Sequence, residues 1–386
     1  MTEKLGRNDP CHCKSGKKYK KCHWHHDRIA WSIRNNPDIL EEPLEAMKRK
    51  QLDHLKFQNT YGKGKDIIST EWQGKRVVAV GSTVHISPID KTKSFHDFLG
   101  NFIEGELGVD WGNEELKKPL ANRHIVLQWY DSVRKLKKNN KTAPSEDGIY
   151  SAVRDGPAGA YYNLAYHLYL IRHNAALKDE FLRRLRVPLQ FQGARYELFV
   201  AATFVRAGFE INFEDERDGS KKHPEFTATH LETGQIIAVE AKSKHRSGIL
   251  GHPGKTQSEG KIRARIGTLL NEAFDKSPPH PYVIFMDVNF PPEPDVREKK
   301  KTRWMDEINA SQAFRRPKSE KDPFNMIIFT NQPHHFGAEG EPDPPLEACR
   351  LVAEKPKIEM ANPISLEAVW DAIGLYGKIP KDFPKD

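Results

Sequence analysis

The feature that most constrains this chain is an apolar run that ends in two opposite charges, IIAVEAK at residues 236–242. Side chains of a β-strand alternate between two faces, so Glu240 and Lys242 point to the same side. Both faces begin with apolar residues, which is typical of a strand covered on both sides. Burying a charge is costly unless the charge is paired or holds a metal ion. Gln235–Lys244 is therefore predicted to be a buried strand that carries functional charges.

Two further acids precede this strand. Residues 195–207 have helical spacing, and Gly208 follows them as a C-cap. Glu197 lies within the apolar stripe of this helix, on the side that should face the core. Residues 209–213 and 223–230 read as extended, and the second run contains Glu225. Charges that break the local apolar pattern together usually mark a functional site.

These residues carry a resemblance to a known family. A helix with Glu197, then Pro224-Glu225, a step of 15 residues, and then Glu240-Ala241-Lys242 resemble the PD-(D/E)xK nuclease superfamily. The resemblance covers roughly residues 195–291. It implies a restriction-endonuclease-like α/β (α+β) fold, in which helices flank a mixed sheet.

The resemblance also implies a site that hydrolyses phosphodiester bonds with Mg²⁺ or Mn²⁺. Glu225 and Glu240 would be metal ligands together with the Ala241 carbonyl, Lys242 would orient the attacking water, and Glu197 would hold metal-bound water. Hard oxygen ligands suit Mg²⁺, which can activate one of its bound waters. The sequence departs from the family pattern at Glu225, where aspartate is more common. The same residues leave open a salt-bridged strand or an inactive nuclease core.

The N-terminal residues contain a second candidate site with the pattern C-x-C-x8-C-H. Three thiols and an imidazole can complete a tetrahedral zinc shell, and here they would be Cys11, Cys13, Cys22 and His23. His25 and His26 are close enough in sequence to compete for the fourth position. A segment this short and polar has almost no core, so metal binding would supply its folding free energy.

The stretch GRNDPCHCKSGKKYKKCH also resembles the SEC-C motif, the zinc-binding tail of the SecA preprotein translocase. His12 and Lys14 stand where that motif usually has proline and glycine. The resemblance implies a structural zinc, not a catalytic one, in a module that contacts protein partners or other macromolecules.

The rest of the chain predicts three parts: a zinc module at 1–27, a mainly helical region at 28–185 with a small hairpin at 75–87, and a nuclease-like domain at 186–386 that includes a C-terminal extension. Within the last part we expect a helix at Lys261–Phe274, buried strands at 282–288 and 325–330, and a final helix at 364–373.

Composition limits the class of protein. A hydrophobic content of 37% and a charged content of 30% are typical of a globular chain, and the net charge of +8 permits a polyanionic partner. There is no apolar run long enough to span a bilayer and no hydrophobic signal region at the N-terminus, so we expect a cytoplasmic protein.

Two functions from different classes follow. The first is a metal-dependent endonuclease or exonuclease that acts on nucleic acid, with DNA favoured over RNA, and by analogy in bacterial genome defence or repair. The second is a non-catalytic adaptor whose zinc module binds a protein, ribosome or translocase partner. Many nucleases of this type are homodimers, and no feature of the sequence decides whether this chain is one.

Overall fold

The computed structural model describes residues 5–36, 41–139, 149, 152–214, 223–291, 302–311, 320–332 and 343–384. By its packing the chain divides into two compact units, Met1–Asn59 and Thr60–Asp386. The three-part division proposed from the sequence stays a prediction. Within the second unit, however, helices from both sides of the proposed boundary at residue 185 pack against one another.

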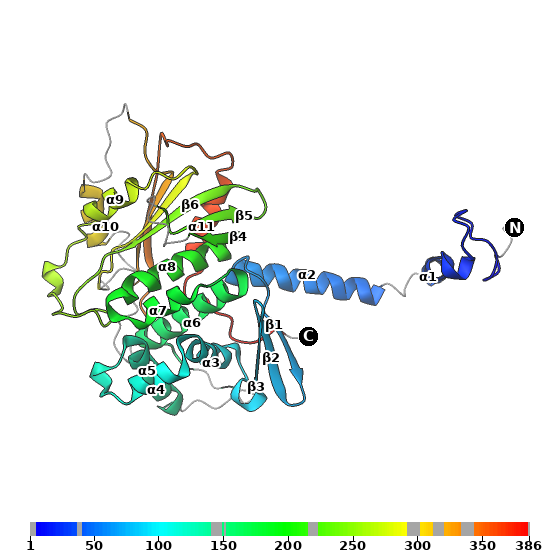
Figure 1. The fold of residues 1–386 in the computed structure, drawn as a ribbon, viewed down its shortest axis with the longest axis horizontal. Coiled ribbons are helices and arrows are strands. Elements are labelled where there is room, and N and C mark those ends of the chain that lie inside the picture. The colour runs from blue at the N-terminus through cyan, green and yellow to red at the C-terminus, as the bar shows by residue number, and fades with distance from the viewer. Residues whose placement is uncertain are drawn as a thin grey trace. The chain divides into compact units, whose positions relative to one another are not determined.

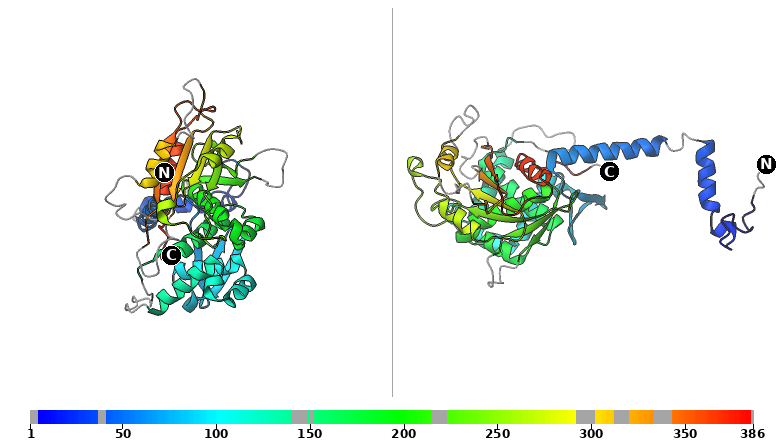
Figure 2. Two further views of the ribbon diagram at one scale, coloured as in Figure 1. Left: turned by 90° about the vertical axis from the view of Figure 1, so that its left-hand side faces the viewer. Right: turned by 90° about the horizontal axis from the view of Figure 1, so that it is seen from above.

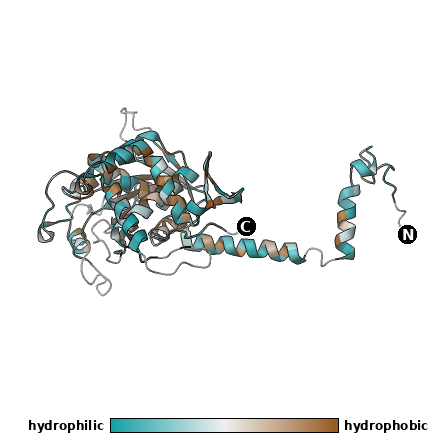
Figure 3. Cartoon of the chain, turned by 90° about the horizontal axis from the view of Figure 1, so that it is seen from below, coloured by the Kyte–Doolittle hydropathy of each residue, from teal (hydrophilic) through white to brown (hydrophobic). Residues whose placement is uncertain are grey.

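The first unit contains little apolar burial. It comprises the 3₁₀ turn η1 (Tyr19–Lys21), the helix α1 (Trp24–Asn35) and α2 (Glu41–Tyr61), whose last residues belong to the second unit. Neither α1 nor α2 has a buried residue. Figure 3 shows apolar and polar segments interspersed along α2, and its exposed apolar side chains are Leu44, Met47, Leu52 and Leu55.

The second unit begins with a three-stranded antiparallel sheet, β1 (Ile68–Trp72), β2 (Lys75–Val80) and β3 (Thr83–Pro88). The hairpin expected at 75–87 is confirmed by β2 and β3. Val78 and Val80 point inward and are buried. The opposite face is apolar but exposed, and it carries Ile68, Trp72, Val84 and Ile86.

Helices and short 3₁₀ turns make up most of the remainder of this unit (Figure 1). In chain order they are η3 (Ile89–Lys91), α3 (Phe95–Leu107), α4 (Val109–Leu116), η4 (Leu120–Asn122), α5 (Ile125–Asn139), α6 (Gly156–Asn174), α7 (Asp179–Arg186), α8 (Pro188–Arg206), η5 (Glu259–Lys261), α9 (Gly267–Phe274), α10 (Arg303–Ala310) and α11 (Ile364–Ile373).

Local sequence explains where several of these helices begin. Ser94 caps α3 and forms a reciprocal capping box with Asp97. Asp155 caps α6, whose first turn contains a proline. The helix expected from residue 195 begins earlier, at Pro188, because proline favours the first helical position and the added turns bury Phe191.

The six-stranded sheet has the order β4-β5-β6-β7-β8-β9 and is mixed in direction. The β4–β5, β5–β6 and β8–β9 pairs are antiparallel, and β6–β7 and β7–β8 are parallel. Figure 2 shows it from two further directions. Its strands are β4 (Phe209–Phe213), β5 (Phe226–His230), β6 (Ile236–Ser243), β7 (Tyr282–Asp287), β8 (Met326–Asn331) and β9 (Glu347–Val352).

Helices cover both faces of this sheet. The long helix α8 packs against β4 and β6 on one face. On the other, side chains of α9 and α10 join the apolar cluster that includes Ala238, Ile284 and Trp304. Because β6 and β7 are in parallel register, Glu240 and Ile284 are neighbours on this second face. The strand expected at 235–244 is therefore buried, as predicted.

One element prediction was wrong. The helix expected at Lys261–Phe274 begins only at Gly267. Ile262, Ala264 and Ile266 are buried at alternate positions, a period that does not fit a helix, and Arg265 between them has a positive φ of 40°. The backbone N–H of Ala264 donates to Glu307 of α10, so a tertiary hydrogen bond replaces a helical one.

Among the described residues, none of the helices combines the length and the apolar character that crossing a membrane requires.

Candidate functional site

The N-terminal cysteines lie in a compact loop held by backbone hydrogen bonds. Cys11 N–H donates to Lys17 O at 2.9 Å, and Lys14 N–H donates to Cys11 O at 3.0 Å. Lys14 and Gly16 have positive φ angles of 59° and 72°. This left-handed backbone favours glycine, which is the residue usual at position 14 in the SEC-C motif. The loop bends sharply enough to bring the two ends of the cysteine pattern together.

The four expected ligands converge. Their ligand atoms all lie within 4.8 Å of one another, and they belong to Cys11, Cys13, Cys22 and His23. His23 Nδ1 is 3.2 Å from the sulfurs of both Cys11 and Cys22, and the sulfurs of Cys13 and Cys22 are 3.5 Å apart. A tetrahedral zinc shell with Zn–S near 2.3 Å needs ligand separations of about 3.6 Å. The donor set and its spacing fit a zinc ion.

Neighbouring side chains support this cluster. The Ser15 hydroxyl lies 3.1 Å from Cys13 Sγ, and its hydrogen bond is the main reason that the pKa of Cys13 falls to about 6, within reach of the thiolate form that zinc binds. Asp27 of α1 contacts His12 Nε2 at 2.6 Å and accepts a hydrogen bond from Tyr19 at 2.9 Å. His26 is not part of the ligand group and lies beside Asp27 instead.

Residues 7–24 match the family model of the SEC-C motif. The comparisons with curated proteins and with solved structures returned no match. The SEC-C match covers the zinc-cluster loop, so it says nothing about the chemistry of the second unit.

In the second unit, buried charges gather around Glu240 of β6. The side chain of Glu240 is 0% exposed, and its Oε1 lies 3.1 Å from Lys242 Nζ and 2.7 Å from Lys276 Nζ. Lys276 Nζ is also 3.5 Å from Oε1 of Glu225, which precedes β5. Oε2 of Glu240 has no hydrogen-bond partner among the described residues. We call these four side chains, Glu225, Glu240, Lys242 and Lys276, the buried charge cluster.

The electrostatics of the buried charge cluster follow from its burial. Desolvation raises the pKa of Glu225 to about 7, with a further contribution from the like charge of Glu240. Desolvation also raises the pKa of Glu240, while Lys276 and then Lys242 oppose this shift. Burial lowers the pKa of Lys242, but the carboxylates of Glu240 and Glu225 outweigh it, so the net shift is upward. Two carboxylates that face a shared cation are a donor set that fits Mg²⁺ or Mn²⁺.

Glu197 is held differently from the other two acids. It lies on α8, is 8% exposed, and accepts hydrogen bonds of 2.7 and 2.5 Å from Arg184 of α7. Arg184 also makes a small contribution that lowers the pKa of Glu225, after those of Lys276 and Lys242. A Cβ built on Gly193 would lie 3.3 Å from His245 Nε2 and 3.7 Å from Glu197 Oε1. Glycine at this position of α8 therefore leaves space for both side chains.

The predicted acids do not form a ready-made cage of three carboxylates. Among the described His, Cys, Asp and Glu residues, only the four N-terminal ligands bring three or more donor atoms within 4.8 Å of one another. The structure brings Glu225, Glu240 and Lys242 together through their ion pairs, and it holds Glu197 separately in a salt bridge with Arg184. The catalytic roles of these residues stay a prediction.

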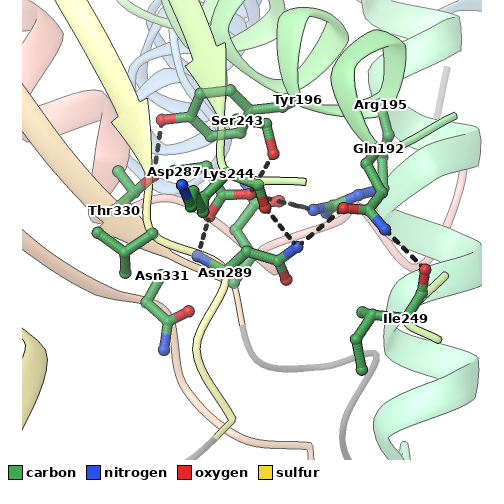
Figure 4. Close-up of polar contacts among 12 residues, drawn as sticks. Gln192, Arg195, Tyr196, Ser243, Lys244, Ile249, Asp287, Asn289, Thr330 and Asn331 are labelled. Carbon is green, nitrogen blue, oxygen red and sulfur yellow. Dashed lines mark hydrogen bonds and ion pairs between the residues drawn. The ribbon is translucent and has the colours of Figure 1, made fainter. Parts of the chain in front are cut away.

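A second polar network lies on the α8 face of the sheet (Figure 4). Asp287 at the end of β7 is fully buried and accepts hydrogen bonds from Ser243 Oγ at 3.0 Å and from Asn289 N–H at 3.2 Å. Arg195 Nη2 lies 3.6 Å from its carboxylate. Burial raises the pKa of Asp287, and Arg195 opposes this effect.

The same network ties α8 to the segment after β6. Gln192 donates to the carbonyls of Arg246 and Ile249 and accepts from Asn289 (Figure 4). Tyr196 and Thr330 are joined by a hydrogen bond of 2.7 Å between their hydroxyls. These hydrogen bonds join α8 to the strand β8 and to the segment after β6, so we assign the network a structural role.

Sequence reasoning missed several of these residues. Asp287 was detectable, because it ends the apolar run YVIFMD just as Glu240 interrupts its own run. Lys276 and His245 carry no such signal, since each lies in a polar stretch where a basic residue is unremarkable. Only their tertiary contacts distinguish them.

Proposed function

We propose that this chain is a metal-dependent nuclease that hydrolyses phosphodiester bonds, in DNA rather than RNA, with a structural zinc module at its N-terminus. The observation that carries the proposal is the buried charge cluster. Glu240 sits at 0% exposure in the middle of an otherwise apolar strand, with Lys242 and Lys276 against it. Buried charges lower the stability of the fold, so their presence in a pattern that resembles a nuclease motif favours a catalytic role for them.

The order of elements around the cluster supports the same proposal. The helix α8 precedes three antiparallel strands, β4 to β6, and α9 then leads to β7, which is parallel to β6. A mixed sheet with this order of elements is compatible with the α/β core that the nuclease resemblance implies, and it supports the proposal to that extent. Fold alone does not establish activity, so the charges remain the stronger argument.

Each residue then has a chemical task. Glu225 and Glu240 would hold a Mg²⁺ or Mn²⁺ ion, which supplies activation of a water and charge neutralisation at the leaving oxygen. Lys242 presents an ammonium that can orient the attacking water and donate to a phosphate oxygen. Arg184 neutralises Glu197 and offers a second cation for the phosphate backbone, which positive side chains bind without regard to sequence.

The test is cleavage of supercoiled and linear DNA by the full chain with Mg²⁺ or Mn²⁺. We expect Lys242→Ala and Glu240→Ala to lower the rate by about 10²–10³-fold, since the first would remove a cation that stabilises the transition state and the second a ligand of the metal ion. Glu210→Gln is the matched control, because Glu210 is an exposed glutamate on β4 of the same sheet. Equal rates in wild type, Lys242→Ala and Glu240→Ala would eliminate the proposed site.

The SEC-C match favours a second candidate, a non-catalytic adaptor whose zinc module binds a macromolecular partner. The two proposals differ in which residues matter. An adaptor predicts that Cys11→Ser and Cys13→Ser abolish capture of a partner, while Glu225→Gln and Glu240→Gln have no effect. A nuclease predicts that the glutamate substitutions abolish divalent-ion binding and cleavage.

A further inference from the structure

Lys276 occupies an unusual position next to the acids. It lies two residues after the last residue of α9, and its backbone N–H donates to Ala273 O at 3.2 Å, which continues the end of the helix. From there its side chain, 16% exposed, reaches Glu240 at 2.7 Å and Glu225 at 3.5 Å. Among the described ion pairs, this is the one in which a single ammonium contacts both acids.

The other lysine of the cluster does not take this place. Lys242 lies two residues along β6 from Glu240, and among the described residues it forms an ion pair with Glu240 alone, at 3.1 Å. Lys276 comes from a different element and lies between carboxylates that belong to β6 and to the segment before β5. A cation between two acids is where a divalent ion bound to both would have to sit.

We propose that Lys276 is a resident cation that competes with a divalent metal ion for Glu225 and Glu240. The inference rests on the proposed function and adds a control on metal loading of that site. The ammonium and a metal ion carry like charges and need the same oxygens, so both cannot contact them at once. The flexible four-carbon stem of lysine lets its ammonium withdraw while the backbone stays in place. Metal binding therefore includes the displacement of Lys276, which weakens the apparent affinity.

The experiment measures metal affinity and does not depend on activity. Mn²⁺ is titrated into the zinc-loaded full chain, and free Mn²⁺ is followed by electron paramagnetic resonance. Lys276→Met removes the charge and keeps a chain of similar length, and we expect it to bind Mn²⁺ about tenfold or more tightly than wild type. Lys276→Arg keeps the charge and should not bind more tightly. Lys244→Met, one residue beyond the end of β6, should match wild type.

A second measurement, thermal unfolding with and without Mn²⁺, shows whether Lys276→Met is folded and binds the ion. Without its ammonium the two acids repel each other, so the metal-free variant should unfold at a lower temperature than wild type, and Mn²⁺ should raise its midpoint by more than it raises that of wild type. Adding Glu240→Gln to Lys276→Met should abolish this gain. Lys276→Gln serves as an alternative substitution in the same titration.

Each outcome decides between the two proposals. Equal or weaker Mn²⁺ affinity in Lys276→Met and Lys276→Gln overturns the competition, even if wild type cleaves DNA. Tighter binding in these variants without DNA cleavage by any form supports the competition and overturns the nuclease. Absence of divalent-ion binding that depends on Glu240, in every form, overturns both.

Discussion

At the scale of single residues, the environment of a side chain matters more than its type. Glu240 and Glu197 are both almost fully buried glutamates. Two lysines form ion pairs with Glu240, whereas one arginine donates two hydrogen bonds to Glu197. A bidentate arginine pair satisfies both carboxylate oxygens, whereas the Glu240 Oε2 has no hydrogen-bond partner in the described part of the chain. This difference makes Glu240 the better candidate for binding an added cation.

His124 allows a prediction about pH. Its ring is 5% exposed and lies edge-on to Trp111 and Phe191, with centroids 5.2 and 5.0 Å away. Burial lowers the pKa of His124 to about 4, although Glu115 opposes the shift. The folded-state pKa is thus below the ordinary value of 6.5, so the neutral ring contributes stability that is present above pH 6.5 and lost as the pH falls toward 4.

We therefore expect the free energy of unfolding to fall by about 2 kcal/mol from His124 between pH 7.5 and pH 5. Urea denaturation of wild type and His124→Asn at both pH values measures this contribution. The asparagine variant should lose less stability than wild type on acidification, and His54→Asn on the exposed helix α2 should behave as wild type. An equal loss in wild type and His124→Asn would show that the pKa of His124 is the same in the folded and unfolded states.

At the scale of elements, strands and helices with a strong apolar period were predicted well, and those without one were not. The strand at 209–213 and the helix at 364–373 have the predicted bounds. The strand β1, with the sequence ISTEW, has no buried residue and is a strand because it pairs with β2. Residues 262–266 are not helical, because Ile262, Ala264 and Ile266 pack into the apolar cluster and the Ala264 N–H donates to Glu307 of α10. Pairing and packing with distant segments override local preference in both cases.

The hairpin of β2 and β3 depends on Gly81. Its φ is +57°, and a Cβ there would lie 2.5 Å from the carbonyl oxygen of Arg172 in α6, which is backbone and cannot rotate away. Gly74, in the turn between β1 and β2, also has a positive φ of 72°, but a Cβ there would meet nothing within 4 Å. Substitutions at the two glycines can therefore be compared, because both would strain the backbone but only a substitution at Gly81 would also cause a steric clash.

We expect Gly74→Ala to lower the free energy of unfolding by about 1 kcal/mol through strain alone. Gly81→Ala should lower it by a further 1–3 kcal/mol or so, because the hairpin must move off α6. Chemical denaturation of the two variants measures the difference. If they were equally destabilised, close approach of the hairpin to α6 would not be the reason for glycine at position 81.

At the scale of the whole molecule, the two units derive their stability from different sources. The unit Thr60–Asp386 has an extensive apolar core around the six-stranded sheet. In the unit Met1–Asn59, the only apolar side chain described as buried is that of Cys11, which is itself a candidate zinc ligand. Folding of the N-terminal loop should therefore be coupled to metal binding.

Metal removal should accordingly affect one unit only. We expect wild type to bind one zinc ion per chain, Cys11→Ser to lose it, and Cys349→Ser, whose cysteine lies on β9, to keep it. Hydrogen exchange should increase in residues 7–24 after chelation and stay unchanged in the strands of the six-stranded sheet. Retention of zinc by Cys11→Ser would point to a different ligand set, with His25 or His26 as the first candidates.

The sequence by itself determined both candidate sites in outline. The cysteine spacing identified the zinc ligands, since four donors within eighteen residues can meet only by folding that loop onto itself. Charges within apolar runs likewise identified Glu240 and Lys242, because their burial follows from the alternation of a strand. The tertiary structure alone decided the partners of these charges. Lys276 and Arg184 reach the acids from other helices, and such long-range pairs depend on how the sheet and helices pack, which local patterns do not encode.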